Sequence, residues 1–264
     1  MATATELARR GATVHLLARD SARAAAARRL IIANSGNSNI SYDLADLCDF
    51  DSVWHYATTF RTRYNHLDVL IHSAAKMYPS YHENRDGLEL TFAGQVVGPF
   101  LLTWLLLPDL LAAAPSRVIV VCSAGLYAQP LTRSMTPVGP ERYRARSAYA
   151  KAHRAQVALS AEWAKRVPSE DIAFHAMHPG RTETPGHKEA LPSRRRVGPF
   201  LRRSPEEGSD TIVWLATAGS GQLGSGQFWH DRRPRPVQLA PLPDPAAARN
   251  ASSLWDYVAD LARQ

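Results

Sequence analysis

Three side chains that can move protons lie close together in the segment RSAYAKAH, residues 146–153. Tyr149 carries a phenol, Lys151 lies two residues later and His153 four residues later. Successive residues of a helix are rotated by about 100°, so Lys151 lies about 200° around from Tyr149, whereas His153 shares its face. The spacing therefore predicts that Tyr149 and His153 face one another, either as an acid–base pair or as an ordinary contact along a helix.

The pair has a chemical weakness as an acid–base unit. A phenol has an unperturbed pKa of about 10, and lowering it by three units requires about 4 kcal/mol of differential stabilisation of the phenolate. A lysine would supply a permanent positive charge, but a histidine, with a pKa of about 6.5, is mostly neutral at pH 7. We therefore expect His153 to support ionisation of Tyr149 less well than a lysine would.

The elements that must position these side chains alternate along the chain. We expect strands within residues 12–19, 39–47, 67–75, 116–125, 172–180 and 226–234, and helices within 2–11, 21–36, 49–64, 86–111, 141–167, 204–218 and 252–264. Near-continuous apolar strands alternating with helices predict an α/β fold, a doubly wound parallel sheet covered on both faces. We expect one such domain over residues 1–233, a proline-rich link over 234–247 and a C-terminal helix over 248–264.

Composition narrows the class of protein. The 264 residues are 45% apolar and 21% charged, which is typical of a globular domain. The two cysteines provide neither a disulfide framework nor a metal site, and no signal peptide is evident, so we expect a cytoplasmic protein. The apolar run 96–114 is interrupted by Pro108, which favours a buried helix over a membrane span.

The net charge of +7 would suit an anionic ligand. Five arginines fall within residues 192–203, a stretch that we interpret as a solvated loop, with an anionic substrate or a membrane surface as alternatives. Aromatic residues are not interleaved with these arginines, so we do not expect nucleic acid as a partner.

Four segments carry a resemblance to a known family. LDVLIHSAA, VIVVCSAG, SAYAKAH and HPGRTETPG, in this order, resemble the short-chain dehydrogenase/reductase family, and the likeness covers nearly the whole chain. The later segments look like the subgroup near dehydrogenase/reductase member 12 and the retinol-dehydrogenase-like reductases. The resemblance implies a Rossmann-like sheet that binds NAD(P) at the carboxyl ends of its strands.

The resemblance also implies roles for individual residues. In the family a tyrosine exchanges a proton with the substrate oxygen, and a serine binds that oxygen. A lysine lowers the pKa of the tyrosine and holds the nicotinamide ribose, and an asparagine completes a proton relay. Tyr149 falls on the tyrosine and Ser123 on the serine, while His153 stands at the lysine position and Gln95 at the asparagine position. The cofactor positions fall on Arg19, beside the 2′-phosphate of NADP, Asp43 at the adenine, Ala74, Ala75, Pro179, Gly180, Thr182 and Thr184.

The start of the chain departs from this pattern. The family opens with a strand and a glycine-rich turn that binds the cofactor pyrophosphate, but here the chain begins within a helix, and Gly11 is interpreted as the end of that helix. In the family order 3-2-1-4-5-6-7 the first strand is central. Without it the strands near residues 13–17 and 68–72 must pair with each other, accept another segment, or belong to a truncated chain, which is the interpretation we favour.

The sequence thus predicts an NADP(H)-dependent oxidoreductase, with NAD as the alternative cofactor, whose activity is weakened or lost. Hydride would pass between the nicotinamide and a small lipophilic carbonyl or alcohol. The alternatives are a non-catalytic binding protein with this fold or a fragment of a longer enzyme. The family often pairs through its two long helices, so a homodimer is one possible partner arrangement, although variation in the tail and loops can block it and the sequence does not determine the oligomeric state.

Overall fold

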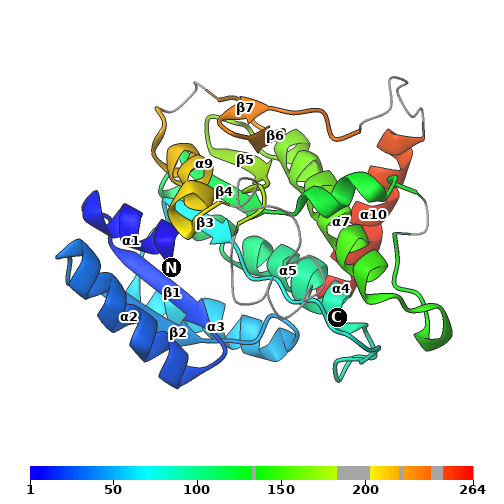
Figure 1. Cartoon of the computed structure of the whole chain (residues 1–264), viewed down its shortest axis with the longest axis horizontal. Helices are drawn as coiled ribbons and strands as arrows, with labels where there is room; N and C mark the ends of the chain where they lie inside the picture. Colours follow the sequence, from blue (N-terminus) through cyan, green and yellow to red (C-terminus); the bar gives the residue numbers. More distant parts are fainter. Residues whose placement is uncertain (133–134, 183–202, 220–222, 239–245, 264) are drawn as a thin grey trace.

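A computed structural model of the chain describes residues 1–132, 135–182, 203–219, 223–238 and 246–263. In these ranges parallel strands alternate with helices in a three-layer α/β arrangement (Figure 1). The strands are β1 (Val14–Ala18), β2 (Ile40–Leu44), β3 (Val69–His72), β4 (Ser116–Val121), β5 (Ile172–Met177), β6 (Gln227–His230) and β7 (Arg233–Pro234). All pair in parallel except β7, which is antiparallel to β6. The predicted fold class is confirmed.

The helices are bounded by the signals that the sequence contains. The long ones are α1 (Ala2–Arg9), α2 (Ser21–Ser35), α3 (Phe50–Arg63), α5 (Gly98–Leu105), α7 (Ala145–Arg166), α9 (Pro205–Thr217) and α10 (Ala247–Arg263). Gly36 directly follows α2 and Gly11 lies two residues after the end of α1, and both take positive φ angles, the conformation that ends a helix. At the start of α9 the Ser204 hydroxyl accepts from the Glu207 N–H and the Glu207 carboxylate accepts from the Ser204 N–H.

The predicted helix at 86–111 is present but divided. It consists of α4 (Leu90–Phe92), a π-helical turn (Ala93–Val97), α5, and α6 (Leu107–Ala112). The break falls at Leu106, two residues before Pro108, because proline clashes with the preceding turn. The π-turn is the element that the apolar pattern did not predict.

The strands form two sheets rather than one. In the part of the chain that the structure describes, β1 pairs only with β2, and the second sheet has the order β3-β4-β5-β6-β7. The facing edges of β1 and β3 do not pair with one another. The division falls where the central first strand of the family would lie, so the first of the alternatives considered from sequence, direct closure, is wrong.

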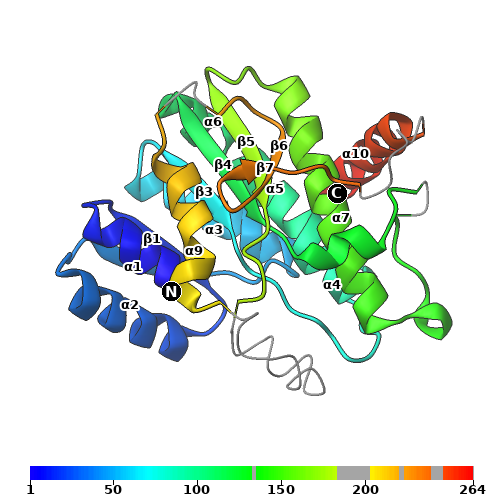
Figure 2. The ribbon, with the colours of Figure 1, turned by 45° about the horizontal axis from the view of Figure 1, so that its top comes forward.

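Helix packing joins the two sheets. On one face α1 packs against α9, and Leu7 contacts the apolar cluster around Ile119 and Leu215. On the other face α3 packs against α5 within the largest core cluster. Figures 1 and 2 show helices on both sides of the strands.

The C-terminal helix belongs to the largest core cluster. Leu254, Trp255 and Val258 are buried, as their shared helical face predicts. Helix α10 lies along α5 and α7, and the Trp255 ring lies 4.9 Å from Phe100 and 4.8 Å from Trp163, centroid to centroid. It therefore covers the two long helices on the side away from the strands (Figure 2). None of the described helices is both long and apolar enough to cross a membrane.

Candidate active site

The carboxyl end of β4 brings the predicted serine to the start of α7. Ser123 caps a short 3₁₀ helix, Ala124–Ala128, and its Oγ accepts a hydrogen bond of 3.3 Å from the Gly125 N–H. A Cβ placed on Gly125 would lie 3.6 Å from Ser123 Oγ and 3.9 Å from the Ala150 methyl group. Ser123 therefore lies across Gly125 from Ala150, the neighbour of Tyr149 in α7.

Tyr149 is a half-buried phenol in the second turn of α7. Burial raises the pKa of its hydroxyl above the ordinary value, and the neighbouring Cys122 thiol raises it further. Both causes oppose ionisation, so Tyr149 is a neutral hydroxyl at physiological pH. In this state it can donate a proton, but it is a poor base.

His153 packs against Tyr149, as the four-residue spacing predicts. The two rings meet edge to face with centroids 4.4 Å apart. The His153 side chain is 1% exposed, and burial lowers its pKa to about 4, although a hydrogen bond to Gln156 opposes this shift. His153 is therefore neutral at pH 7, and it does not supply the positive charge that a lysine would bring to Tyr149.

Gln156 determines which nitrogen of His153 carries the proton. His153 Nδ1 lies 2.7 Å from Gln156 Oε1, which also accepts from the Cys122 thiol at 3.8 Å. Because the amide oxygen only accepts, Nδ1 is the protonated nitrogen. His153 Nε2 is then a buried acceptor, and it has no hydrogen-bond partner among the described residues. Gln156 was not selected from the sequence, although its position three residues after His153 in the helix could have indicated this contact.

Lys151 does not replace the missing cation. It lines a separate pocket together with Arg142 and Arg144, on another side of α7. This placement agrees with the helical rotation of about 200° between Tyr149 and Lys151.

Gln95 lies in the π-turn and holds the segment that follows β3. Its Nε2 donates a hydrogen bond of 2.9 Å to the Lys76 carbonyl, while its buried Oε1 has no partner among the described residues. A π-turn inserts one extra residue into a helix and is frequent at functional sites. Gln95 is thus brought to the strand end, where it contacts backbone.

The strand-end motif HSAA has an inner and an outer part. His72 is buried, and burial lowers its pKa to about 4. Because the Thr103 hydroxyl donates to the Pro99 carbonyl, it accepts a hydrogen bond of 2.8 Å from His72 Nε2. Ser73, Ala74 and Ala75 are exposed at the carboxyl edge. Ala74 and Ala75 therefore border the open edge, while His72 fixes the strand to α5.

A second loop borders the same edge after β5. Gly180 has a φ of +78°, and a Cβ there would meet Arg203 Nε at 2.9 Å. The Pro179 carbonyl accepts from Thr182 Oγ1 at 3.3 Å and from Arg203 at 3.4 Å. Pro179, Gly180 and Thr182 thus form one tight turn against α9. Thr184 and residues 192–202 of the arginine-rich stretch lie outside the described residues.

The two residues expected at the adenosine end, Arg19 and Asp43, form ion pairs with different partners. Arg19 is exposed after β1, 3.7 Å from Asp46. Asp43 instead forms an ion pair with Arg63 and lies 3.1 Å from His15 Nε2. Asp46, a residue not selected from sequence, is therefore the carboxylate beside Arg19.

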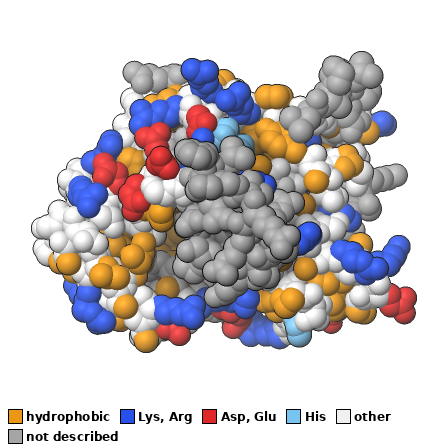
Figure 3. Space-filling model, in the orientation of Figure 1, with side chains coloured by type: hydrophobic (Ala, Val, Ile, Leu, Met, Phe, Trp, Pro, Cys, Tyr) orange, Lys and Arg blue, Asp and Glu red, His pale blue; other side chains and the backbone are white. Residues whose placement is uncertain are grey.

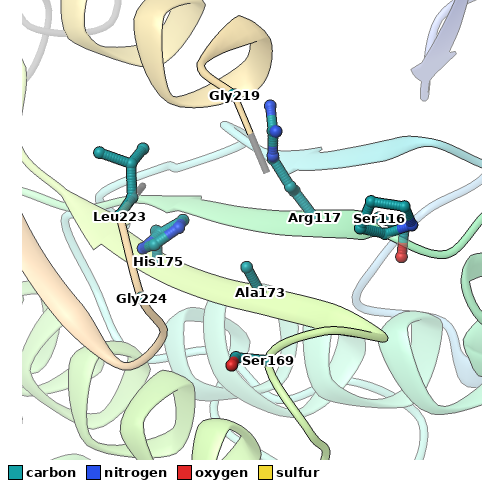
Figure 4. A pocket seen from close by; sticks show the side chains of 9 residues that line it. Ser116, Arg117, Ser169, Ala173, His175, Gly219, Leu223 and Gly224 are labelled. Carbon is teal, nitrogen blue, oxygen red and sulfur yellow. The ribbon is translucent and has the colours of Figure 1, made fainter. Parts of the chain in front are cut away.

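A pocket at the other end of the sheet is unrelated to this site. It is lined by the first residues of β4 and by β5, including Arg117 and His175 (Figure 4). Arg117 donates to the carbonyls of Leu215 and Ala216, so it caps the end of α9. His175 accepts from the Trp229 indole N–H at 3.2 Å. These are structural contacts.

Comparisons with known proteins establish the class. The family model described as short chain dehydrogenase matches residues 1–195. The chain belongs to the short-chain dehydrogenase/reductase family. It is 37% identical to Dehydrogenase/reductase SDR family member 12 of Bos taurus, over all of this chain and 82% of that protein. Identity to the Homo sapiens protein of that name is 39%, over 90% of this chain and 74% of that one.

Further relatives agree with this assignment. Retinol dehydrogenase 11 of Homo sapiens is 30% identical over 98% of this chain and 80% of its own length. Among solved structures, an uncharacterised protein of Mycobacterium paratuberculosis has a TM-score of 0.75 at 25% identity, covering 99% of this chain and 88% of that one. This short-chain dehydrogenase/reductase therefore has the fold and chain order of its oxidoreductase family, whose members use NAD(P).

The described residues match the family's cofactor site over only part of the length of the cofactor. Ser123, Tyr149, Pro179 and Gly180 border the carboxyl edge where the family holds the nicotinamide, and Arg19 lies exposed after β1. The phosphate region differs, because the edges of β1 and β3 face one another without a glycine-rich turn between them in the described residues.

Proposed function

We propose that this short-chain dehydrogenase/reductase is a slow NADP(H)-dependent oxidoreductase for a lipophilic carbonyl or alcohol. The observation that carries the proposal is the packing of Ser123 across Gly125 against α7, next to Tyr149, at the carboxyl end of β4. The cofactor would supply the hydride. The name of the related retinol dehydrogenases supports a lipophilic alcohol or aldehyde as substrate.

Ser123 and Tyr149 have different roles in the proposed reaction. Ser123 donates a hydrogen bond to the substrate oxygen and orients it. Tyr149, a neutral phenol, donates its proton to that oxygen as the carbonyl is reduced. General acid catalysis of this kind contributes about 10²–10⁴-fold to the rate.

The missing cation limits the rate. His153 is neutral and buried, so the Tyr149 phenolate that remains after proton transfer is not stabilised by a neighbouring positive charge from His153. Three pKa units of lost stabilisation correspond to about 4 kcal/mol, or about a thousandfold in rate. We therefore expect turnover well below that of a relative with lysine at this position.

NADPH consumption with decanal and with all-trans-retinal tests the proposal. We expect slow oxidation of NADPH that depends on aldehyde, falls at least 100-fold in Tyr149→Phe and falls about tenfold in Ser123→Ala. Lys151→Ala, on the other side of α7, is the matched control and should retain wild-type activity. Aldehyde-dependent turnover that is equal in wild type and Tyr149→Phe would exclude this role for Tyr149.

A non-catalytic nucleotide-binding protein is the second candidate. The occlusion of His153, 1% exposed with its Nε2 lacking a partner, favours it, because the relay position is closed to the cofactor. This candidate predicts NADPH binding without aldehyde-dependent consumption. The same assay therefore separates the two functions.

A further inference from the structure

A pocket beside the start of α7 is lined by three basic side chains, those of Arg142, Arg144 and Lys151. Neither Tyr149 nor Ser123 lines it, so it is separate from the candidate active site. In Figure 3, lysine or arginine side chains lie beside apolar ones at the right-hand edge of the visible face, in the region where α7 begins in Figure 1. The cations therefore border a surface pocket rather than an open basic surface.

The two arginines flank a residue that is fixed by its side chain. Tyr143 is buried, and its hydroxyl donates a hydrogen bond of 2.9 Å to the Tyr78 carbonyl. Its ring also meets that of Tyr81 edge to face, with centroids 5.7 Å apart. The backbone that carries Arg142 and Arg144 is therefore positioned before a ligand arrives, which lowers the entropic cost of binding.

The charges around the pocket are not balanced. Within the described ranges Arg142, Arg144 and Lys151 form no ion pair. Arg144 Nη1 donates to the Tyr143 carbonyl at 2.8 Å, which uses one of the five N–H groups of the guanidinium. Among the described lining residues Glu89 alone is acidic, so three positive charges and one negative charge leave a net charge of +2.

Glu89 is bound by backbone amides rather than by the arginines. Its Oε1 accepts from the Thr91 N–H at 2.7 Å, and its Oε2 accepts from the Phe92 N–H at 3.0 Å. The carboxylate is buried and caps the first turn of α4. The basic side chains of the pocket are therefore left to bind an anion from outside the chain.

The size and the charge of the cavity narrow the class of ligand. Its volume is about 60 Å³, which is room for about four water-sized groups. A phosphate group fits this space, whereas a dinucleotide does not. A phosphomonoester carries a charge of about −1.5 to −2 at pH 7, which matches the local +2 more closely than a single carboxylate would. Guanidinium groups also match the geometry of phosphate oxygens.

We propose that Arg142 and Arg144 bind the phosphate group of a phosphomonoester in this pocket, and that the charge of Lys151 strengthens the attraction. Phe92 and Met135 are buried and line the pocket, so they form an apolar floor that strengthens the charge interactions. The recognised chemistry is a terminal phosphate, carried either by a free phosphomonoester or by the headgroup of phosphatidic acid. The site is independent of the nicotinamide cofactor and of turnover.

Titration of inorganic phosphate into the ¹⁵N-labelled full chain at constant ionic strength tests the site by NMR. We expect the amide resonances of Arg144 and Ser147, two lining residues, to shift and to saturate at millimolar phosphate. Arg142→Gln and Arg144→Gln should each weaken binding about tenfold. Arg146→Gln is the matched control, because it removes an exposed charge of the same helix that does not line the pocket, and it should bind as wild type does.

Thermal unfolding shows whether the variants remain folded. Arg142 and Arg144 are exposed, so both variants should unfold at the wild-type temperature. A Ser147 amide that does not respond to phosphate in wild type overturns the site. An equal phosphate affinity of wild type and the folded Arg142→Gln and Arg144→Gln variants also overturns it.

Vesicles distinguish the two sources of the phosphate. Sedimentation with phosphatidylcholine vesicles that carry phosphatidic acid is compared with sedimentation with phosphatidylserine vesicles of equal charge. Binding to the first kind alone, reversed by inorganic phosphate and lost in Arg142→Gln, supports the site with a lipid headgroup as its ligand. Phosphate-dependent shifts without vesicle binding support the site with a free phosphomonoester as its ligand.

Discussion

His153 Nδ1 lies 2.7 Å from Oε1 of Gln156, one turn further along α7. This hydrogen bond fixes the proton on Nδ1 and leaves Nε2 as a bare acceptor beside Tyr149. A residue at the family's lysine position therefore offers no charge to the phenol. If Tyr149 acts as proposed, it can serve as an acid, but His153 supplies no cation that would favour its phenolate.

Gln156→Glu should convert His153 into a cation. A carboxylate at Oε1 favours the imidazolium, so the pKa of His153 should rise from its buried value of about 4. Histidine NMR titration measures this directly. We expect the His153 resonance of wild type to be unchanged between pH 5.5 and 8, whereas that of the variant titrates in this interval.

Gln156→Met is the matched control. It keeps the length of the side chain but leaves both His153 and Cys122 without the oxygen that accepts their hydrogen bonds. Leaving a buried donor unsatisfied costs about 1–3 kcal/mol of stability. A variant as stable as wild type would show that the Gln156 bond is not made in solution.

Acid should destabilise the protein through its buried histidines. Burial lowers the pKa of His72, His153, His175 and His178 to about 4. The unfolded chain, with a histidine pKa of about 6.5, binds more protons than the folded chain between pH 4 and 6.5. Stability is therefore fully present above pH 6.5 and declines as pH falls towards 4.

Urea unfolding at pH 7.0, 6.0 and 5.0 measures this dependence. Each buried histidine contributes a loss of about 1.4 kcal/mol per pH unit below 6.5. Replacing His72 by Asn should reduce the slope, whereas replacing the exposed His55 by Gln should leave it unchanged. A stability that is constant from pH 7 to 5 would contradict the neutral, buried state of these rings.

The C-terminal helix should be essential for stability. Trp255 packs against Phe100 and Trp163 and carries Arg166 over its ring at 4.0 Å. Trp255→Ala should cost about 3–5 kcal/mol. Trp54, which is 49% exposed on α3, provides the control, and Trp54→Ala should change the free energy of unfolding by about 0.5 kcal/mol or less.

The same helix should influence association. Because α10 covers α5 and α7, the helices through which the family often pairs, we expect a monomer by light scattering at micromolar concentration. A stable dimer in which α10 remains folded would contradict this expectation.

Local patterns predicted the order of elements well. Gly11, Gly36 and the Ser204–Glu207 capping box set helix ends through interactions within a few residues, so their positions follow from sequence. The position of the π-turn around Gln95 did not follow from sequence, and the Gln95 side chain in it bonds to the Lys76 carbonyl, 19 residues away. Local periodicity contains no information on such a contact.

The candidate site was predictable in part. The positions of Ser123 and Tyr149 follow from the strand-end and helix motifs, and the Tyr149–His153 contact follows from helical spacing. The neutral state of His153 depends on burial by distant segments, and the partners of Arg19 and Asp43, which are Asp46 and Arg63, are set by the fold.

The most direct test is the pH dependence of alcohol oxidation with NADP⁺ between pH 6 and 10. In the proposed reaction, oxidation requires the Tyr149 phenolate, and the pKa of this phenol lies above its ordinary value. We predict that kcat/KM rises about tenfold per pH unit across the whole interval and that Tyr149→Phe abolishes the activity. A plateau reached near pH 7 would show that a cation does act on the phenol, and it would contradict the account.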